Sequence, residues 1–252
     1  MSGHSKWHSI KHKKAKEDAK KGNIFGKLSR MISIAVREGG SGDPANNNTL
    51  ANALAKAKEY NLPQDNIERA IKKGLGEMDG AKLERFMYEG YGPGGIAVMV
   101  DVTTENKNRT AADVRSIFSR NNGSLGESGC VAWMFDRKGI ITVDKSSVED
   151  YDDFMLKAID CGAEDIEETE DAYEIKTDPQ ATNEVKNNLI AGSINVKFID
   201  VVLIPKTTVK LNKHETEKAL KIINALDDYD DIENVYTNLE IEDEMLDEIS
   251  QD

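Results

Sequence analysis

Cysteines, long apolar runs and C-terminal basic residues are all scarce in this chain of 252 residues. Two cysteines, Cys130 and Cys161, are too few for a disulfide framework and favour reduced thiols in a cytosolic protein. The longest apolar runs, such as 96–100 and 201–204, fall far short of the roughly 18 residues that span a bilayer. No apolar segment follows the basic first fourteen residues, as a secretory signal would require. We therefore expect a cytoplasmic protein with no membrane partner.

Charge is distributed unevenly along the chain, whose formal net charge is −13. Residues 1–37 contain ten basic and two acidic side chains, a net charge of +8, which leaves −21 for the other 215 residues. No Lys or Arg follows Lys221, whereas twelve acidic residues do. An acidic body with one basic end predicts that a nucleic-acid partner binds at that end.

The segment from Gly26 to Leu75 has the apolar periodicity of short helices. In the first helix, apolar side chains recur at the spacing of one helical face until a group of glycines ends it. A second helix is expected over about 47–60, and Pro63 is placed to open a third. Short turns between these helices predict a small three-helix domain.

The following sequence mixes strands and helices. Residues 86–91 and 96–103 flank Gly92-Pro93-Gly94-Gly95, which predicts a β-hairpin, and a helix is expected over about 109–121. Residues 131–135 and 140–143 flank Asp136-Arg137-Lys138-Gly139 and predict a second hairpin. Beyond it we expect helices over about 148–161, 180–191 and 215–226, and strands over 166–169, 173–177, 196–204, 206–211 and 233–241.

This order of elements predicts an α+β multidomain fold. It consists of an N-terminal three-helix domain and two small α/β domains of the ferredoxin-like, split βαβ kind, the second inserted in the first. The predicted boundaries are 1–78 for the basic arm and helical domain, 79–130 plus 205–241 for the first α/β domain, 131–204 for the inserted α/β domain, and 242–252 for an acidic tail.

The basic arm is the strongest chemical signal in the sequence. Cations along a flexible segment neutralise phosphates and release counterions without a folded groove, and Trp7 could stack on a base. The alternative is a solvated tail that only keeps the protein soluble. The candidate nucleic-acid-binding residues are His4, Lys6, Trp7, His8, Lys11, His12, Lys13, Lys14, Lys16, Lys20, Lys21, Lys27, Arg30, Lys72, Lys73, Lys107 and Arg109. For Lys107 and Arg109, a solvated helix face is an equally good explanation.

Metal and catalytic sites are poorly supported. His4, His8 and His12 recur every four residues, but neighbouring lysines would repel a metal ion, so hydrogen bonds to phosphate or bases fit better. The glycine-rich segment 90–95 lies between two strands and lacks a following Lys-Ser or Lys-Thr, which favours a turn over a phosphate cradle. The acidic runs 149–153 and 164–171 are typical of solvated surfaces. We expect a non-enzyme with no metal, no cofactor and no small-molecule substrate.

Several dense sequence blocks resemble the YebC/PmpR family. They are Gly3–Trp7, Ile10–Lys14, Leu62–Gly74, Tyr88–Gly95, Asn106–Thr110 and Met134–Gly139. The resemblance is dense from residue 2 to about 140 and looser to about 240. It implies a helical N-terminal domain followed by two α/β domains.

The resemblance also implies a role in gene expression. Bacterial members of that family are usually described as DNA-binding transcriptional regulators. Others, including the mitochondrial translational activator of cytochrome oxidase, look like ribosome-associated translation factors. We expect a nucleic-acid-binding regulator, with DNA-binding transcription regulation as the first hypothesis. An rRNA-binding translation factor or translational activator is the alternative. A protein–protein adaptor that uses the acidic α/β surface is a third hypothesis.

Overall fold

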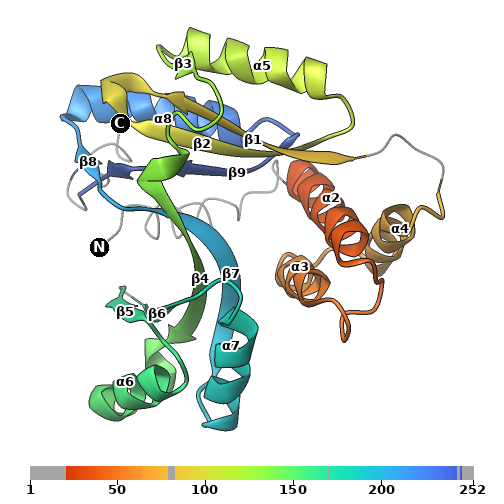
Figure 1. The fold of residues 1–252 in the computed structure, drawn as a ribbon, viewed down its shortest axis with the longest axis vertical. Helices are drawn as coiled ribbons and strands as arrows, with labels where there is room; N and C mark the ends of the chain where they lie inside the picture. Colours follow the sequence, from red (N-terminus) through yellow and green to blue (C-terminus); the bar gives the residue numbers. More distant parts are fainter. Residues whose placement is uncertain (1–20, 79–82, 170, 243–244, 246–252) are drawn as a thin grey trace. The chain divides into compact units, whose positions relative to one another are not determined.

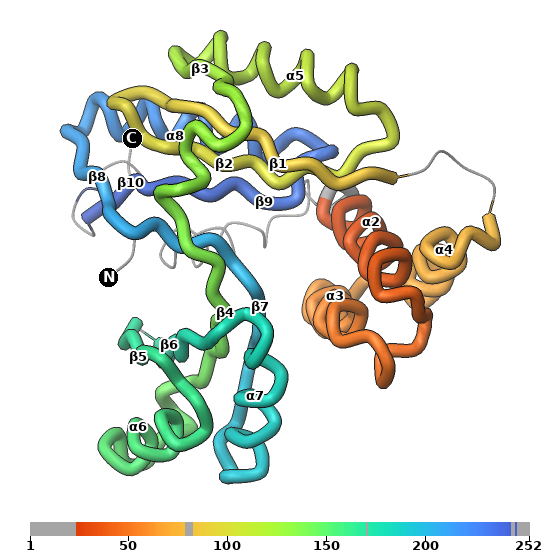
Figure 2. The backbone as a smooth tube through the Cα atoms, viewed as in Figure 1, coloured from red at the N-terminus to blue at the C-terminus, as the bar shows by residue number. Residues whose placement is uncertain are grey.

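The structure is a computed structural model that describes residues 21–78, 83–169, 171–242 and 245. Two compact units make up these residues (Figures 1 and 2). One unit is residues 135–204. The other joins the chain up to Met134 with the chain from Pro205 onward.

The larger unit begins with helices α2 (Lys21–Gly39), α3 (Asn48–Glu59) and α4 (Gln64–Gly74). Helix α2 packs on both of the others around a core that includes Ile32, Val36 and Leu50, all fully buried. Burying each such side chain stabilises the fold by about 1.5–3 kcal/mol. Ser33 Oγ donates to the Ala70 carbonyl oxygen at 2.8 Å, which joins α2 to α4.

The turn between α2 and α3 is organised by the buried side chain of Asn47. Its Oδ1 accepts from the Leu50 backbone N–H at 3.0 Å and caps α3, while its Nδ2 donates to the Ala35 carbonyl oxygen at 2.8 Å. A Cβ atom at Gly39 would overlap this amide, so the end of α2 requires a glycine.

An antiparallel sheet in the order β3-β1-β2-β9 follows. Its strands are β1 (Glu84–Tyr91), β2 (Ala97–Thr104), β3 (Ser124–Leu125) and β9 (Ile232–Thr237). A 3-10 turn, η2 (Pro93–Gly95), joins β1 to β2 in the predicted first hairpin. Helices α5 (Lys107–Arg120) and α8 (Lys213–Asp227) share one core with alternate residues of β2, so both cover the same sheet face.

A short parallel pair, β8 (Val209–Lys210) and β10 (Leu239–Glu240), lies beside this sheet. The predicted strand 233–241 is therefore interrupted at Asn238. The Asn238 side chain accepts from the Ala97 N–H at 2.8 Å, and its carbonyl oxygen accepts from the Val209 N–H at 2.8 Å. At Asn238 the chain passes from β9, which pairs with β2, to β10, which pairs with β8, and this change of partner explains the interruption.

The unit 135–204 contains β4 (Phe135–Asp144), α6 (Tyr151–Asp160), β5 (Asp165–Glu168), β6 (Ala172–Thr177), α7 (Thr182–Ala191) and β7 (Val196–Pro205, the last residue of which belongs to the larger unit). Short 3-10 turns η3 (Ala132–Met134) and η4 (Lys145–Ser147) flank β4. Its sheet order is β5-β6-β4-β7, and both helices contribute to the same core. This is the split βαβ arrangement.

The predicted α+β fold, with its helical N-terminal part and its ferredoxin-like α/β part, is confirmed. The predicted second hairpin around 136–139 is wrong, because β4 runs unbroken through these residues. Gly139 pairs with Thr177, and a Cβ atom there would overlap the hydroxyl groups of Thr177 and Thr182. This glycine permits close packing rather than a turn. The predicted strand 206–211 is also wrong in extent, since only residues 209–210 form a strand.

Candidate nucleic-acid interface

Most of the predicted nucleic-acid-binding residues lie outside the described residues. They are His4, Lys6, Trp7, His8, Lys11, His12, Lys13, Lys14, Lys16 and Lys20. Lys21 is the first residue of α2. The predicted role of these residues stays a prediction.

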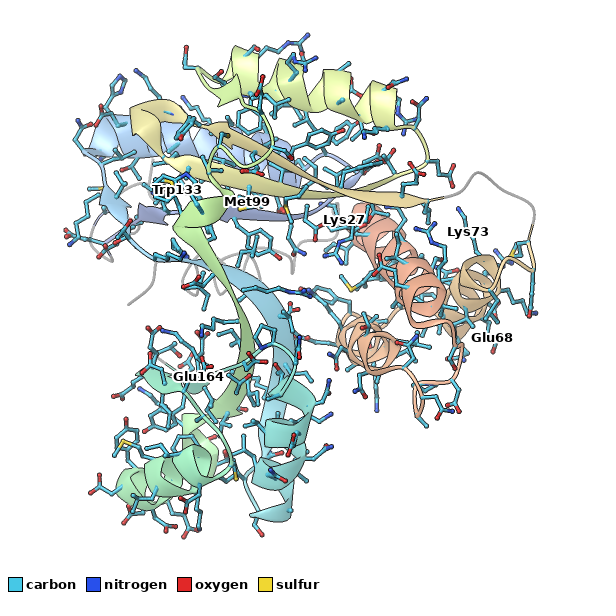
Figure 3. All side chains as sticks on the ribbon, in the orientation of Figure 1. Lys27, Glu68, Lys73, Met99, Trp133 and Glu164 are labelled. Carbon is cyan, nitrogen blue, oxygen red and sulfur yellow. The ribbon has the colours of Figure 1, made fainter. Side chains whose placement is uncertain are left out.

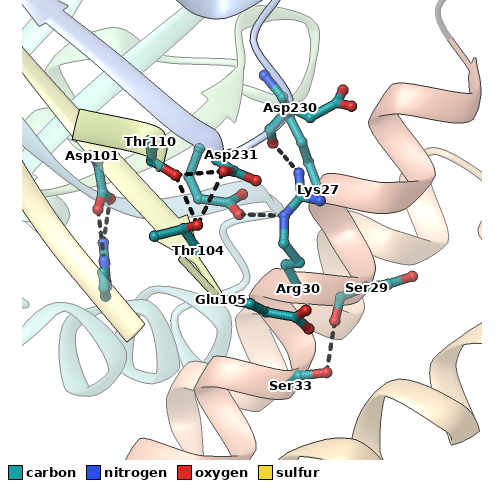
Figure 4. Close-up of polar contacts among 12 residues, drawn as sticks. Lys27, Ser29, Arg30, Ser33, Asp101, Thr104, Glu105, Thr110, Asp230 and Asp231 are labelled. Carbon is teal, nitrogen blue, oxygen red and sulfur yellow. Dashed lines mark hydrogen bonds and ion pairs between the residues drawn. The ribbon is translucent and has the colours of Figure 1, made fainter. Parts of the chain in front are cut away.

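Two predicted residues of α2, Lys27 and Arg30, contact the chain from the last residue of α8 to the start of β9, and Figure 4 shows the contacts of Arg30. Lys27 Nζ donates to the Asp227 carbonyl oxygen at 2.5 Å. Arg30 donates to the Asp230 carbonyl oxygen, and its Nε lies 3.4 Å from Glu233 Oε1. Both cations therefore join α2 to the α/β part of the larger unit, and this use competes with any phosphate contact.

Glu233 is an acid that the sequence reasoning did not single out. It is 8% exposed, and Oε2 has no hydrogen-bond partner among the described residues. Burial raises the pKa of Glu233 to about 7, against the opposing attraction of Arg30 and Lys27. An acid with this pKa gains or loses its charge near neutral pH where α2 meets β9.

Helix α4 carries the neighbouring candidates Lys72 and Lys73, of which Figure 3 labels Lys73. Lys73 Nζ lies 2.7 Å from Glu105 Oε1, and both side chains are about two-fifths exposed. Lys72 is exposed and has no ion-pair partner among the described residues. Of the two, Lys72 is the lysine whose charge is not already opposed by a contacting carboxylate.

Helix α5 presents Lys107 and Arg109 at its first turn, where Asn106 Oδ1 accepts from the Arg109 backbone N–H at 3.1 Å. Lys107 Nζ lies 4.3 Å above the Phe86 ring, a cation–π contact. Arg109 Nη2 donates to Asp231 Oδ2 at 3.0 Å, although the Arg109 side chain is still 57% exposed. Both cations are thus positioned by the fold and remain accessible.

Asp231 is the centre of a polar cluster with Thr104 and Thr110 (Figure 4), and it also positions Arg109. The hydroxyl oxygens of Thr110 and Thr104 lie 2.7 and 3.0 Å from its Oδ2. Burial alone would raise the pKa of Asp231, but hydrogen bonds from Thr110 and Arg109 outweigh it, so the pKa is lowered. Asp231 therefore stays charged at neutral pH.

The ion pair between Lys73 and Glu105 brings the end of α4 close to the start of α5. The structure thereby gathers Lys73, Lys107 and Arg109 in one region, while Lys27 and Arg30 are directed at residues 227–233. Arg109 also borders an open depression, which is otherwise lined by Asp113, Asp228, Tyr229, Asp230 and Asp231. These acids make the depression itself unfavourable for phosphate.

Metal ligands and membrane spans can be assessed only for the described residues. No group of three or more His, Cys, Asp or Glu side chains there could hold a metal ion. No helix in that part of the chain has the length and apolar character needed to cross a membrane. The thiols of Cys130 and Cys161 are free, and burial raises the pKa of each.

Two family models match almost the entire chain. "TACO1/YebC protein N-terminal domain" matches residues 5–77, and "TACO1/YebC second and third domain" matches residues 83–239. The chain belongs to the TACO1/YebC family. This confirms the family resemblance inferred from the sequence blocks.

Similar TACO1/YebC proteins are named probable transcriptional regulatory proteins. One from Halothermothrix orenii is 49% identical over 254 residues and covers 100% of both chains. Another from Desulforamulus reducens is 53% identical over 243 residues, which covers 96% of this chain and 100% of the relative.

A crystal structure of a similar protein supports the fold. A conserved hypothetical protein from Aquifex aeolicus aligns with a TM-score of 0.82 and 43% sequence identity. The alignment covers 92% of this chain and 95% of that one. The TACO1/YebC fold described above is therefore shared with an experimentally determined structure.

Proposed function

We propose that the protein is a nucleic-acid-binding regulator of gene expression that acts on DNA in transcription and binds through its basic arm. The observation that carries the proposal is the charge separation between residues 1–37, at +8, and the rest of the chain, at −21. Phosphate binding by clustered cations supplies most sequence-independent affinity for nucleic acid. The names of the TACO1/YebC relatives agree with this role.

The charges of the described residues favour the arm over the body as the main contact. The unit 135–204 contains seven basic and seventeen acidic side chains, so it repels phosphate. In the larger unit, Lys27, Arg30 and Lys73 already contact carbonyl or carboxylate oxygens. Lys72 and Lys107 would then add secondary contacts, together with Arg109, whose side chain stays 57% exposed although it is paired with Asp231.

A charge-reversal experiment tests this proposal. Lys11, Lys13 and Lys14 are each changed to Glu, and binding to double-stranded DNA is measured by fluorescence anisotropy. The matched control reverses Lys157, Lys186 and Lys221 in the acidic body, an equal change in net charge. The arm variant should lose at least a hundredfold in affinity, and the control should lose less than threefold. Equal losses in both variants would reject the arm as the binding element.

Ribosomal RNA is the second candidate partner, favoured by one specific observation. Duplex DNA readers place a basic helix in a groove, whereas Lys73 on α4 is neutralised by Glu105 and Arg109 on α5 is held by Asp231. A thin basic arm on an acidic body suits a narrow crevice in folded RNA.

Sucrose-gradient sedimentation of a lysate distinguishes DNA from ribosomal RNA as the partner. Salt-sensitive co-migration with ribosomes, lost in the arm variant, would favour rRNA. Migration at the top of the gradient at low and high salt would favour DNA.

The proposal includes a cytoplasmic location and action without catalysis, cofactor or small-molecule substrate. In the depression beside Arg109, two of the four carboxylates accept internal hydrogen bonds: Tyr229 Oη donates to Asp113 Oδ2 at 2.6 Å, and Asp231 accepts from Arg109. Burial, with the hydrogen bond to Asp113, raises the pKa of Tyr229 to about 12, so it stays a neutral phenol. These groups are arranged to stabilise the fold rather than to transfer protons.

A further inference from the structure

The loop between β3 and β4 is held in place by the buried carboxylate of Glu89 on β1. Glu89 Oε1 accepts from the Gly129 backbone N–H at 2.7 Å, and Oε2 accepts from the Val131 and Ala132 N–H groups at 2.9 and 2.7 Å. Gly129 has a φ of 90°, a conformation that favours glycine. Three charge-assisted hydrogen bonds to one carboxylate fix the backbone just before Trp133.

Trp133 follows this loop and is 64% exposed, the highest value among the large exposed hydrophobic side chains of the described residues. Its indole Nε1 donates to the Cys130 carbonyl oxygen at 3.1 Å (Figure 3 labels Trp133). Tyr91, 39% exposed at the end of β1, donates its hydroxyl to the same oxygen at 3.1 Å. The two aromatic side chains therefore meet at one carbonyl oxygen, and their polar groups are already satisfied inside the protein.

A positive charge accompanies this aromatic pair. Lys206 Nζ donates to the Trp133 carbonyl oxygen at 3.0 Å, and the Lys206 backbone N–H donates to the Met134 carbonyl oxygen at 2.9 Å. All of these residues belong to the larger unit. The surface thus combines two aromatic side chains with an exposed lysine residue whose ammonium group is held against the Trp133 backbone.

We propose that Trp133 and Tyr91 form a stacking platform for an unpaired nucleobase of single-stranded RNA or DNA, with Lys206 close to the adjoining phosphate. The proposal rests on the proposed nucleic-acid-binding function and adds a second contact to the basic arm. Aromatic side chains beside a cation are the usual way in which proteins hold single strands without reading a sequence. Duplex nucleic acid keeps its bases stacked inside and would not use the platform.

A nucleobase fits this surface better than a protein partner. A stable protein interface buries roughly 800 Å² on each side around an apolar core, and two exposed aromatic side chains do not approach that area. Aromatic side chains in protein interfaces also commonly use their N–H or O–H group to bond the partner. Here the Tyr91 hydroxyl and the Trp133 N–H both donate to the Cys130 carbonyl oxygen, so these side chains present mainly their ring surfaces to solvent.

Intrinsic fluorescence gives a direct test, because the chain has only two tryptophans, Trp7 and Trp133. In a Trp7→Phe background, Trp133 is the sole indole. Twelve-nucleotide oligo(U), oligo(dT) and a duplex of equal length are titrated into the protein. Stacking predicts that single strands quench the indole emission and that the duplex does not. The stronger quencher of the two single strands identifies RNA or DNA as the source of the base.

Affinities of further variants of the full-length protein complete the test. Trp133→Ala should lower single-strand affinity roughly tenfold and leave duplex affinity unchanged, since stacking contributes about 1–3 kcal/mol per base. Trp133→Phe should restore most of the loss, which separates stacking from misfolding. The matched control is Leu156→Ala, because Leu156 is a similarly exposed hydrophobic side chain in the other unit.

Three outcomes would overturn the platform. The first is single-strand binding that neither quenches Trp133 nor weakens in Trp133→Ala, while reversal of Lys11, Lys13 and Lys14 abolishes it. In that case the stacking proposal is rejected, and the proposed binding through the basic arm is retained. The second is an equal loss of single-strand and duplex binding in Trp133→Ala. The third is the absence of binding to every oligonucleotide, which would reject the proposed function as well.

Discussion

Arg30 of α2 and Glu233 of β9 form an ion pair across the contact between the helices and the sheet, with Nε and Oε1 3.4 Å apart. The two residues are separated by 203 positions in the sequence. The Glu233 side chain is only 6% exposed, against 22% for Arg30. Keeping the charged form of a nearly buried acid with a single, long hydrogen bond lowers the stability of the folded state, and this effect depends on pH.

The stability of the protein should therefore fall as Glu233 loses its proton. Burial raises its pKa from 4.5 to about 7, so the folded state holds a proton that the unfolded state has released. Its contribution to stability is fully present below about pH 4.5 and is lost as the pH rises through about 7. The loss should be about 3 kcal/mol in total. Urea unfolding at pH 5.5 and pH 8 spans about 2 kcal/mol of this loss.

Glu233→Gln is the comparison for this prediction, because glutamine has a similar shape and no titration. The variant should show a smaller drop in unfolding free energy between the two pH values than the parent protein does. All other titrating groups, including Asp231 with its lowered pKa, are common to both proteins and cancel. An identical pH dependence in both would show that Glu233 does not titrate in this range.

Residues 135–204 should fold as an inserted domain. In the larger unit, the Lys206 N–H donates to the Met134 carbonyl oxygen at 2.9 Å, so the two chain ends that flank the insertion are already adjacent. A short Gly-Ser linker in place of residues 135–204 should leave a folded protein with a single cooperative unfolding transition. Loss of circular dichroism and of cooperative unfolding in this variant would contradict the insertion.

Lys72 and Lys73 provide a matched pair of neighbours on one helix. Lys73 is paired with Glu105, whereas Lys72 is exposed, so Lys72 should contribute more to phosphate binding. Lys72→Ala should weaken nucleic-acid binding roughly fivefold at about 0.1 M salt, the value of one phosphate contact. Lys73→Ala should weaken it less than twofold. Anisotropy titrations under identical salt conditions decide between this order and its reverse.

A structural feature of this protein could be predicted from its sequence when the interactions that form it join residues close together in the chain. Local patterns were sufficient for α2 and for the hairpin of β1 and β2, because helical periodicity and a Gly-Pro-Gly-Gly turn are short-range signals. The segment 136–139 was misread because Asp-Arg-Lys-Gly is typical of a turn. The actual role of Gly139 depends on Thr177 and Thr182, about forty residues away along the chain.

The partners of the candidate site residues were inaccessible to sequence reasoning for the same reason. Lys27 contacts the Asp227 carbonyl oxygen across 200 positions, and Arg109 contacts Asp231 across 122. Trp133 was placed in a strand by the apolar run 131–135. Its turn is instead fixed by Glu89, more than forty residues earlier. Charge composition identified the arm, since net charge does not depend on tertiary contacts.

The salt dependence of binding tests the central claim, that the basic arm contacts phosphates, most directly. The logarithm of the association constant is measured against the logarithm of salt concentration, for the parent protein and for the variant with Lys11, Lys13 and Lys14 changed to Glu. Each phosphate contact contributes about −0.7 to −0.9 to the slope, so the arm variant should show a slope shallower by at least about 2. Equal slopes and equal affinities in the two proteins would contradict the claim.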